Sequence, residues 1–196
     1  MPRELKEEEK KFEKSRLIKS GANLLLRFGI RRVSVEDIVK EASIAKGSFY
    51  NYFRSKDDFI YEVIWQFHEE LFSHFEQQFF LINKLEREQK RKEIKKMFFT
   101  IYKSSIFEFF ILEHSEIRNF LSRYSKEALE RIEALEENKY KELFNLLNIK
   151  NKYVKIVQNY IHIIIFGISH TDLLDKNYLD KTIEVALDGL LNYLEV

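Results

Sequence analysis

The sequence predicts an all-α protein, and its length and composition carry that prediction. The chain has 196 residues, of which 45% are hydrophobic and 15% aromatic, so it can bury a core and is not a disordered chain. It contains only 5 Gly and 1 Pro, whereas a β-rich protein of this size needs many turn residues. Cysteine is absent, which excludes disulfides, thiolate metal sites and cysteine nucleophiles.

The first predicted helix runs from about Glu8 to Phe28. Its apolar residues recur at helical spacing, with Leu17, Gly21 and Leu24 on one stripe. Glycine inside a helix costs about 1 kcal/mol relative to alanine, so we expect Gly21 to permit close contact with another helix. Gly29 is expected to end the first helix in a left-handed conformation.

Two short helices separated by a tight turn follow. Ser34 is placed to accept a hydrogen bond from the amide of Asp37, so we expect a helix from Val35 to about Ala42. A short break then leads into a helix from Lys46 to Phe53. This order of elements is the helix-turn-helix arrangement, predicted here at about residues 34–53.

The rest of the chain is also predicted to be helical. Ser55 and Asp58 repeat the capping pattern, so a connecting helix is expected over about residues 56–81. Ser125 and Asn177 are predicted to cap later helices. The remaining helices are expected near residues 89–112, 115–123, 126–147, 152–173 and 178–195.

The sequence contains no predicted membrane span and no predicted targeting segment. The most apolar run, from Tyr160 to Ile168, is far shorter than the about 20 residues that a bilayer requires. The N-terminal segment MPRELKEEEKKFEKS lacks the apolar core of a signal peptide. We therefore expect a cytoplasmic protein.

Charge is distributed unevenly along the chain. Residues 1–56 hold 14 Lys and Arg against 8 Asp and Glu, a net charge of +6, although the whole chain has a net charge of only +1. A basic first quarter on an acidic remainder indicates an N-terminal part that meets a polyanion. A solvated helix surface with a chance imbalance of charge would give the same numbers.

The third helix is predicted to have two different faces. Phe49 and Phe53 are four residues apart and are expected to point inward. The other face is small, basic, aromatic and amide-bearing. Such a face suits a helix in a major groove, because Lys binds phosphate or guanine and Asn binds an adenine edge. This outward face consists of Lys46, Gly47, Tyr50 and Asn51.

The stretch from Leu17 to Phe59 resembles the N-terminal DNA-binding domain of the TetR family of transcriptional regulators. A Tyr-x-Tyr-Phe-x-Ser-Lys block after a helix-turn-helix, here residues 50–56, is a specific part of that resemblance. The rest of the chain agrees with the family only in length and helical character. The residues that match the family pattern are Gly29, Ser34, Val35, Asp37, Ile38, Ala42, Ile44, Lys46, Gly47, Phe49, Tyr50, Tyr52, Phe53, Ser55 and Lys56.

The resemblance implies a DNA-binding domain at residues 1–56 and a ligand-binding and dimerisation domain at residues 57–196. It also implies that Ser34 and Val35 begin the supporting helix beside the DNA backbone. At Lys56, a positive charge at a helix start would hold a phosphate. The DNA contacts of the family fall on Lys46, Gly47, Ser48, Tyr50, Asn51, Tyr52 and Lys56 of this chain.

Two positions depart from the family pattern. Ser43 stands where the family usually has Gly, and a left-handed residue with a Cβ costs about 1 kcal/mol. Ala45 stands where Ser or Thr often caps the recognition helix, and Ala is the poorer cap by about 1 kcal/mol. Both departures indicate a less rigid recognition helix, and neither removes a DNA contact.

No motif in the sequence indicates an enzyme or a cofactor site. There is no serine-nucleophile elbow, no P-loop and no GxGxxG motif. The histidines form no HExxH motif and no pair four residues apart, so no metal site is expected. They are His68, His74, His114, His162 and His170.

Aromatic residues crowd the middle of the chain. Core packing is the better interpretation for any one of them, and the family resemblance adds that some line an apolar ligand pocket. They include Phe75, Phe79, Phe80, Phe98, Phe99, Tyr102, Phe107, Phe109, Phe110 and Phe120.

The last two helices are strongly apolar. They could form an ordinary core hairpin, whereas the resemblance implies a four-helix bundle with the same two helices of a second copy. Gly167 and Gly189 would allow close helix approach. The broad apolar face of the last helix consists of Ile183, Ala186, Leu187, Leu190 and Leu194.

Together these features predict a homodimeric DNA-binding regulator, most simply a repressor, that binds a near-palindromic operator. A small apolar or amphipathic ligand would release it from DNA. The alternative is a helical small-molecule-binding or protein-interaction module that does not bind an operator.

Overall fold

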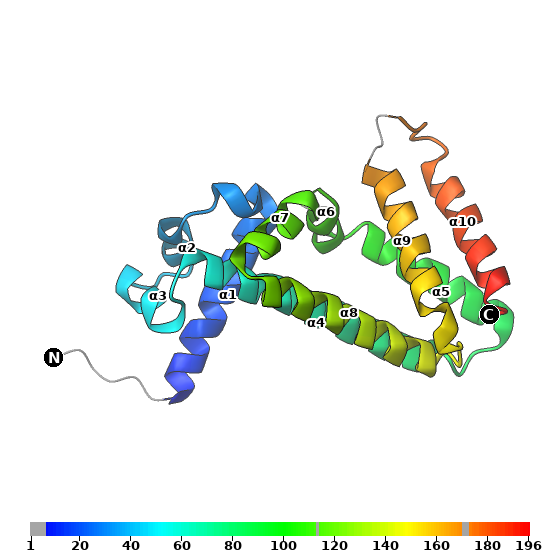
Figure 1. Ribbon diagram of the computed structural model, residues 1–196, viewed down its shortest axis with the longest axis horizontal. Coiled ribbons are helices and arrows are strands. Elements are labelled where there is room, and N and C mark those ends of the chain that lie inside the picture. The colour runs from blue at the N-terminus through cyan, green and yellow to red at the C-terminus, as the bar shows by residue number, and fades with distance from the viewer. Residues whose placement is uncertain (1–6, 113, 170–172) are drawn as a thin grey trace. The chain divides into compact units, whose positions relative to one another are not determined.

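The computed structural model describes residues 7–112, 114–169 and 173–196, and it confirms the predicted all-α fold class (Figure 1). Within these ranges the chain forms ten α-helices and one 3-10 turn and contains no strand. The helices are α1 (Glu7–Arg32), α2 (Val35–Glu41), α3 (Lys46–Tyr52), α4 (Lys56–Ile82), α5 (Arg87–Tyr102), α6 (Ser105–Leu112), α7 (His114–Tyr124), α8 (Lys126–Leu146), α9 (Val154–Ser169) and α10 (Leu179–Tyr193), and the 3-10 turn is Asn151–Tyr153.

The chain divides into two compact units. The first unit comprises Met1–His68 and Glu113–Leu129, so α7 packs in the same unit as α1, α2 and α3. The second unit comprises Glu69–Leu112 and Glu130–Val196. These units are defined by packing, whereas the division at residue 56 into DNA-binding and ligand-binding parts remains a functional prediction.

The core of the first unit is built around three phenylalanine rings. The ring of Phe49 lies 5.2 Å from that of Phe53 and 5.6 Å from that of Phe59, measured between centroids. Phe49 and Phe59 are fully buried, and Phe53 is nearly so. The predicted inward face of the third helix is therefore confirmed.

Gly21 explains how α1 and α4 come so close. A Cβ at Gly21 would lie 2.1 Å from Cζ and 2.6 Å from Cε1 of Phe59, which leaves no room for any side chain. The helix contact predicted for this glycine is confirmed, and its partner is the ring at the centre of the core.

Local caps set the helix starts in the first unit. The Ser34 hydroxyl accepts a hydrogen bond from the Asp37 amide at 3.2 Å, and the Asp37 carboxylate accepts one from the Ser34 amide at 2.9 Å, so α2 begins with a complete capping box. The hydroxyl of Ser55 accepts from the amide of Asp58 at 3.0 Å at the start of α4. Both predicted caps are confirmed.

Two residues with positive φ mark the turns of the first unit. Gly29 has φ 76° and ψ 166°, a conformation that is essentially restricted to glycine. Gly29 interrupts the helix, and the chain is helical again up to Arg32. The predicted break at this glycine is therefore present, but its ψ of 166° is extended and not that of the predicted left-handed helical conformation. Ser43 has φ 51° in the turn between α2 and α3, where the sequence predicted a left-handed residue.

Several boundaries of the later helices differ from the prediction. The helix predicted over 89–112 is two helices, because the chain turns at Lys103 and the hydroxyl of Ser104 caps α6 by accepting from the Phe107 amide at 3.2 Å. Ser125 caps α8 as predicted, accepting from the Ala128 amide at 3.1 Å.

Asn177 does not cap α10, which begins after Tyr178. The backbone amide of Asn177 instead donates to the side chain of Asp175 at 3.0 Å and forms part of the preceding turn. The end of the helix predicted over 152–173 lies partly outside the described residues, since α9 is described to Ser169.

In the second unit α10 packs against both α9 and α5 (Figure 1). The apolar face of α10 points into the core of its own unit, where Leu187 and Leu190 are buried. The core-hairpin interpretation therefore holds for this face. None of the described helices is both long and apolar enough to cross a membrane.

Candidate nucleic-acid interface

The outward face of α3 is open to solvent. Lys46, Gly47, Tyr50 and Asn51 are exposed, and Tyr50 retains 52% of its accessible surface. A Cβ at Gly47 would meet no atom within 4 Å, so the backbone here is approachable. Ser48 is half-buried at the edge of this face. The structure thus brings these five predicted residues together on one helix.

Ser34 and Val35 lie at the start of α2 and differ in what they can offer. Ser34 is half-buried, and its hydroxyl both accepts from the Asp37 amide and donates to the Asp37 carboxylate at 2.6 Å. These hydrogen bonds lower the pKa of Asp37. The Val35 side chain is buried in the core, so only the backbone of this residue is available for a contact.

Lys46 forms an ion pair with Glu36, which joins the first turn of α3 to the first turn of α2. Both side chains are exposed, Lys46 at 54% and Glu36 at 63%. The hydrogen bond between them lowers the pKa of Glu36 and raises the pKa of Lys46. A predicted DNA-contacting cation is therefore already bound to a carboxylate of the same chain.

Tyr52 is held in a similar way by α1. Its hydroxyl donates a 2.8 Å hydrogen bond to Oε2 of Glu13. Burial, followed by this hydrogen bond, raises the pKa of Tyr52 to about 12. In contrast to Tyr50, Tyr52 is half-buried.

Lys56 occupies the first residue of α4, directly after the capping Ser55. Its ammonium donates to the carbonyl of Arg31 at 3.5 Å, and the guanidinium of Arg31 forms an ion pair with Glu116 of α7. A cation at a helix start has the charge and the neighbouring amides that bind an anion.

Sequence reasoning missed several residues that support this surface. Arg16 of α1 donates to the carbonyl of Ala42 at the end of α2, next to the strained Ser43. Tyr124 of α7 donates to Asp58 at 2.6 Å. These partners lie 26 and 66 residues apart in the chain, and no local sequence signal connects them.

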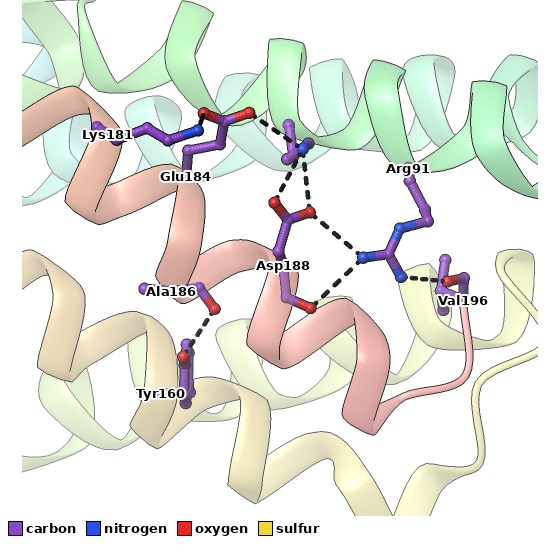
Figure 2. Close-up of polar contacts among 8 residues, drawn as sticks. Arg91, Tyr160, Lys181, Glu184, Ala186, Asp188 and Val196 are labelled. Carbon is purple, nitrogen blue, oxygen red and sulfur yellow. Dashed lines mark hydrogen bonds and ion pairs between the residues drawn. The ribbon is translucent and has the colours of Figure 1, made fainter.

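The second unit contains an open groove of about 1050 Å³ between α5 and α10. Its lining is mostly charged, and Figure 2 shows Arg91 between Asp188 and the carbonyl of Val196. Lys95 lies 3.0 Å from Asp188 and lowers the pKa of that carboxylate. The pKa of Glu184 is lowered first by its hydrogen bond from Lys181 and then by Lys95, which lies 3.3 Å away. This groove differs from the apolar pocket predicted for a ligand.

Most of the central aromatic residues pack in the cores. Phe109 and Phe120 are buried, whereas Phe80 is exposed at 56%. Partly buried aromatic residues packed on the cores of the second unit include Phe75, Phe79, Phe98, Phe99, Tyr102 and Phe107.

No group of three or more His, Asp or Glu side chains among the described residues is placed to hold a metal ion.

Large apolar side chains remain exposed on the other faces of α9 and α10. Their spacing places those of each helix on one side of that helix. Gly167 also lies on the exposed part of α9, and a Cβ there would meet no atom of its own chain within 4 Å. These exposed residues are Ile156, Ile163 and Phe166 on α9 and Val185 and Tyr193 on α10.

Fold and surface together define an all-α helix-turn-helix protein, and comparison with known proteins shows what its helix-turn-helix region is similar to. Residues 17–63 match the family of bacterial regulatory proteins named tetR. This match covers the helix-turn-helix region of the chain. The family and the similar proteins below are regulators and not enzymes.

Two relatives match this same region. The transcriptional regulator AcuR of Cereibacter sphaeroides is 49% identical over 43 residues, which are 22% of this chain and 20% of AcuR. The HTH-type transcriptional repressor DhaR of Mycobacterium sp. is 38% identical over 55 residues, 28% of each protein. The chain thus matches less than a third of the length of these relatives.

The likeness in fold extends over nearly the whole chain. The crystal structure of SCO4454, a TetR-family transcriptional regulator from Streptomyces coelicolor, superposes with a TM-score of 0.62 and 14% identity. The superposition covers 94% of this chain and 90% of SCO4454. At this identity the likeness concerns the fold alone.

Proposed function

We propose that this protein is a transcriptional regulator that binds double-stranded DNA through the exposed face of α3. The observation that carries the proposal is the open face of Lys46, Gly47, Tyr50 and Asn51 within a region that matches the tetR family. The α3 helix would lie in the major groove, with Lys46 and Asn51 at base edges or phosphates. Lys56, at the start of α4, would bind a phosphate.

The proposed regulator acts as a homodimer through α9 and α10. Support comes from the apolar residues that each helix leaves exposed, because obligate interfaces are hydrophobic and resemble a core cut in half. Two copies would then place two α3 helices on the two halves of a palindromic operator. Binding to chromosomal DNA would place the protein in the cytoplasm.

The proposed regulator represses its target and is released by a small apolar or amphipathic ligand. Repression is supported by the relative DhaR, which is named a repressor. The ligand would bind the second unit and favour a state that does not fit the operator. A typical coupling of about 1–3 kcal/mol between the two sites suffices for such control.

The test is a gel shift on DNA that flanks the gene of this protein, repeated over a series of salt concentrations. Saturable binding is expected for a helix-turn-helix regulator, with the logarithm of the binding constant falling linearly with the logarithm of salt concentration. A control duplex of the same length and scrambled sequence measures non-specific binding.

Equal affinity for both duplexes would favour the alternative, a helical small-molecule-binding or protein-interaction module without operator binding. The mass of any co-purified ligand, measured under native conditions on the same sample, identifies the effector class independently of DNA binding.

A further inference from the structure

Two donors on the proposed DNA-binding surface are each bound to a carboxylate from a neighbouring helix. The ammonium of Lys46 pairs with Glu36 of α2, and the hydroxyl of Tyr52 donates to Glu13 of α1. Carboxylate and phosphate oxygens are both anionic acceptors for such donors. Each carboxylate therefore occupies a place at its donor that a DNA phosphate could take.

The two pairs differ in how readily a phosphate can replace the carboxylate. Tyr52 is half-buried and bonded to a half-buried Glu13, so this hydrogen bond is part of the packing between α1 and α3. Lys46 and Glu36 are both more than half exposed. Surface ion pairs contribute little to stability, so a phosphate can displace Glu36 from Lys46.

We propose that Glu36 lowers the affinity of the protein for DNA by competing with phosphates for Lys46. This inference rests on the proposed function, because it requires that the α3 surface binds DNA. While Lys46 is paired with Glu36, it neutralises no phosphate and releases no counterion from the duplex. Once the pair opens, Glu36 is left without its cation beside a polyanion, which adds a repulsion.

The proposal predicts a specific change in salt dependence. Each phosphate neutralised by a cation adds about 0.9 to the magnitude of the slope of log K against log salt concentration. On non-operator DNA no base contact helps to open the ion pair, so Glu36 competes there most effectively with phosphates for Lys46. Releasing Lys46 should therefore steepen the slope on non-operator DNA by up to about 0.9.

The experiment measures binding of the full-length protein to a random-sequence duplex by fluorescence anisotropy over a series of KCl concentrations. Glu36→Gln removes the ion pair and one negative charge. The matched control is Glu41→Gln, which removes the same charge from an exposed position on the same helix, α2. We expect Glu36→Gln to bind about two- to fivefold more tightly, with the steeper slope, and Glu41→Gln to keep the wild-type slope.

The same two substitutions made in Lys46→Gln protein separate competition for Lys46 from general effects of charge. In Lys46→Gln protein, Glu36→Gln should have no more effect than Glu41→Gln. If the two variants shift slope and affinity equally in the wild-type background, the inference is overturned while the proposed function stands. If the wild-type protein shows no salt-dependent binding to any duplex, the proposed function itself fails.

Circular dichroism of each variant shows whether the fold is retained. Because Glu36 and Lys46 are exposed, the wild-type helix signal is expected throughout.

Discussion

The hydroxyl of Tyr124 donates a 2.6 Å hydrogen bond to Oδ1 of Asp58, which joins the end of α7 to the first turn of α4. The other carboxylate oxygen of Asp58 accepts from the backbone amide of Arg54 at 3.1 Å. The ring of Tyr124 also stacks on Tyr61, with centroids 5.3 Å apart. One carboxylate thus serves both the local start of α4 and a contact from far along the chain.

Replacing Tyr124 by Phe should cost about 2 kcal/mol, the usual contribution of a hydrogen bond to a charged group, while keeping the ring contacts. The hydrogen bond, followed by burial, raises the pKa of Tyr124 to about 12 in the folded protein. A raised pKa stabilises the fold below the unfolded value of about 10, and this stabilisation is lost as pH rises from about 10 to about 12.

Denaturant unfolding of wild type and Tyr124→Phe between pH 8 and pH 12 checks this prediction. The free energies of unfolding should differ at pH 8 and converge toward pH 12. Tyr178→Phe, which removes an exposed hydroxyl, is the control. A difference that stays constant with pH would contradict the assigned hydrogen bond.

Gly21→Ala should destabilise the protein by about 1–3 kcal/mol, although Ala normally favours a helix. The added Cβ would collide with the buried ring of Phe59. Thermal unfolding followed by circular dichroism measures the loss. Gly47→Ala is the matched control, since its Cβ meets no atom within 4 Å. Equal melting temperatures for Gly21→Ala and wild type would show that α1 and α4 are not in close contact at this position.

Tyr50→Ala should abolish operator binding without unfolding the protein. Tyr50 is half exposed on α3, and its ring lies 5.3 Å from that of the buried Phe49, measured between centroids. A gel shift measures the loss of binding, and a melting curve measures the fold. A lost thermal transition would instead mean that Tyr50 contributes mainly to the core.

Lys56→Ala should weaken binding to all DNA sequences alike and reduce the magnitude of the salt slope by about 0.9. The reason is the proposed phosphate contact at the start of α4. Salt titrations on operator and scrambled duplexes provide the measurement. A slope equal to that of wild type on both duplexes would rule out this contact.

Val185→Glu should produce a folded monomer. Val185 is 62% exposed on α10, so a charge there is tolerated in one chain but would be buried without a partner in the proposed dimer. Leu190→Glu should instead unfold the protein, because Leu190 is only 6% exposed in the core of its own unit. Sedimentation and circular dichroism distinguish the two results. A dimeric Val185→Glu protein would place the interface elsewhere.

Local chemistry made much of the first unit predictable from the sequence. Ser34 with Asp37, and Ser55 with Asp58, bond across three residues, and a short-range pattern captures such caps. Phe49 and Phe53 share a face for the same reason.

The remaining features depend on contacts that local patterns do not contain. The break near Ser104 interrupts a helical pattern without Gly or Pro. The pairing of Glu13 with Tyr52 spans 39 residues. On α10, periodicity placed the buried Leu187 on the broad apolar face and left the exposed Val185 off it. It did not show whether that face packs on the same chain or on a second copy.

The placement of α7 has a consequence for how the protein is made. The first unit consists of two stretches of chain, and the second stretch supplies Glu116 and Tyr124 to helices that precede it by many residues. During synthesis from the N-terminus, the helix-turn-helix segment leaves the ribosome before these partners exist. Its packing is completed only after α7 has emerged. Any N-terminal fragment that stops at His68 should therefore fold less stably than the same residues do in the whole chain.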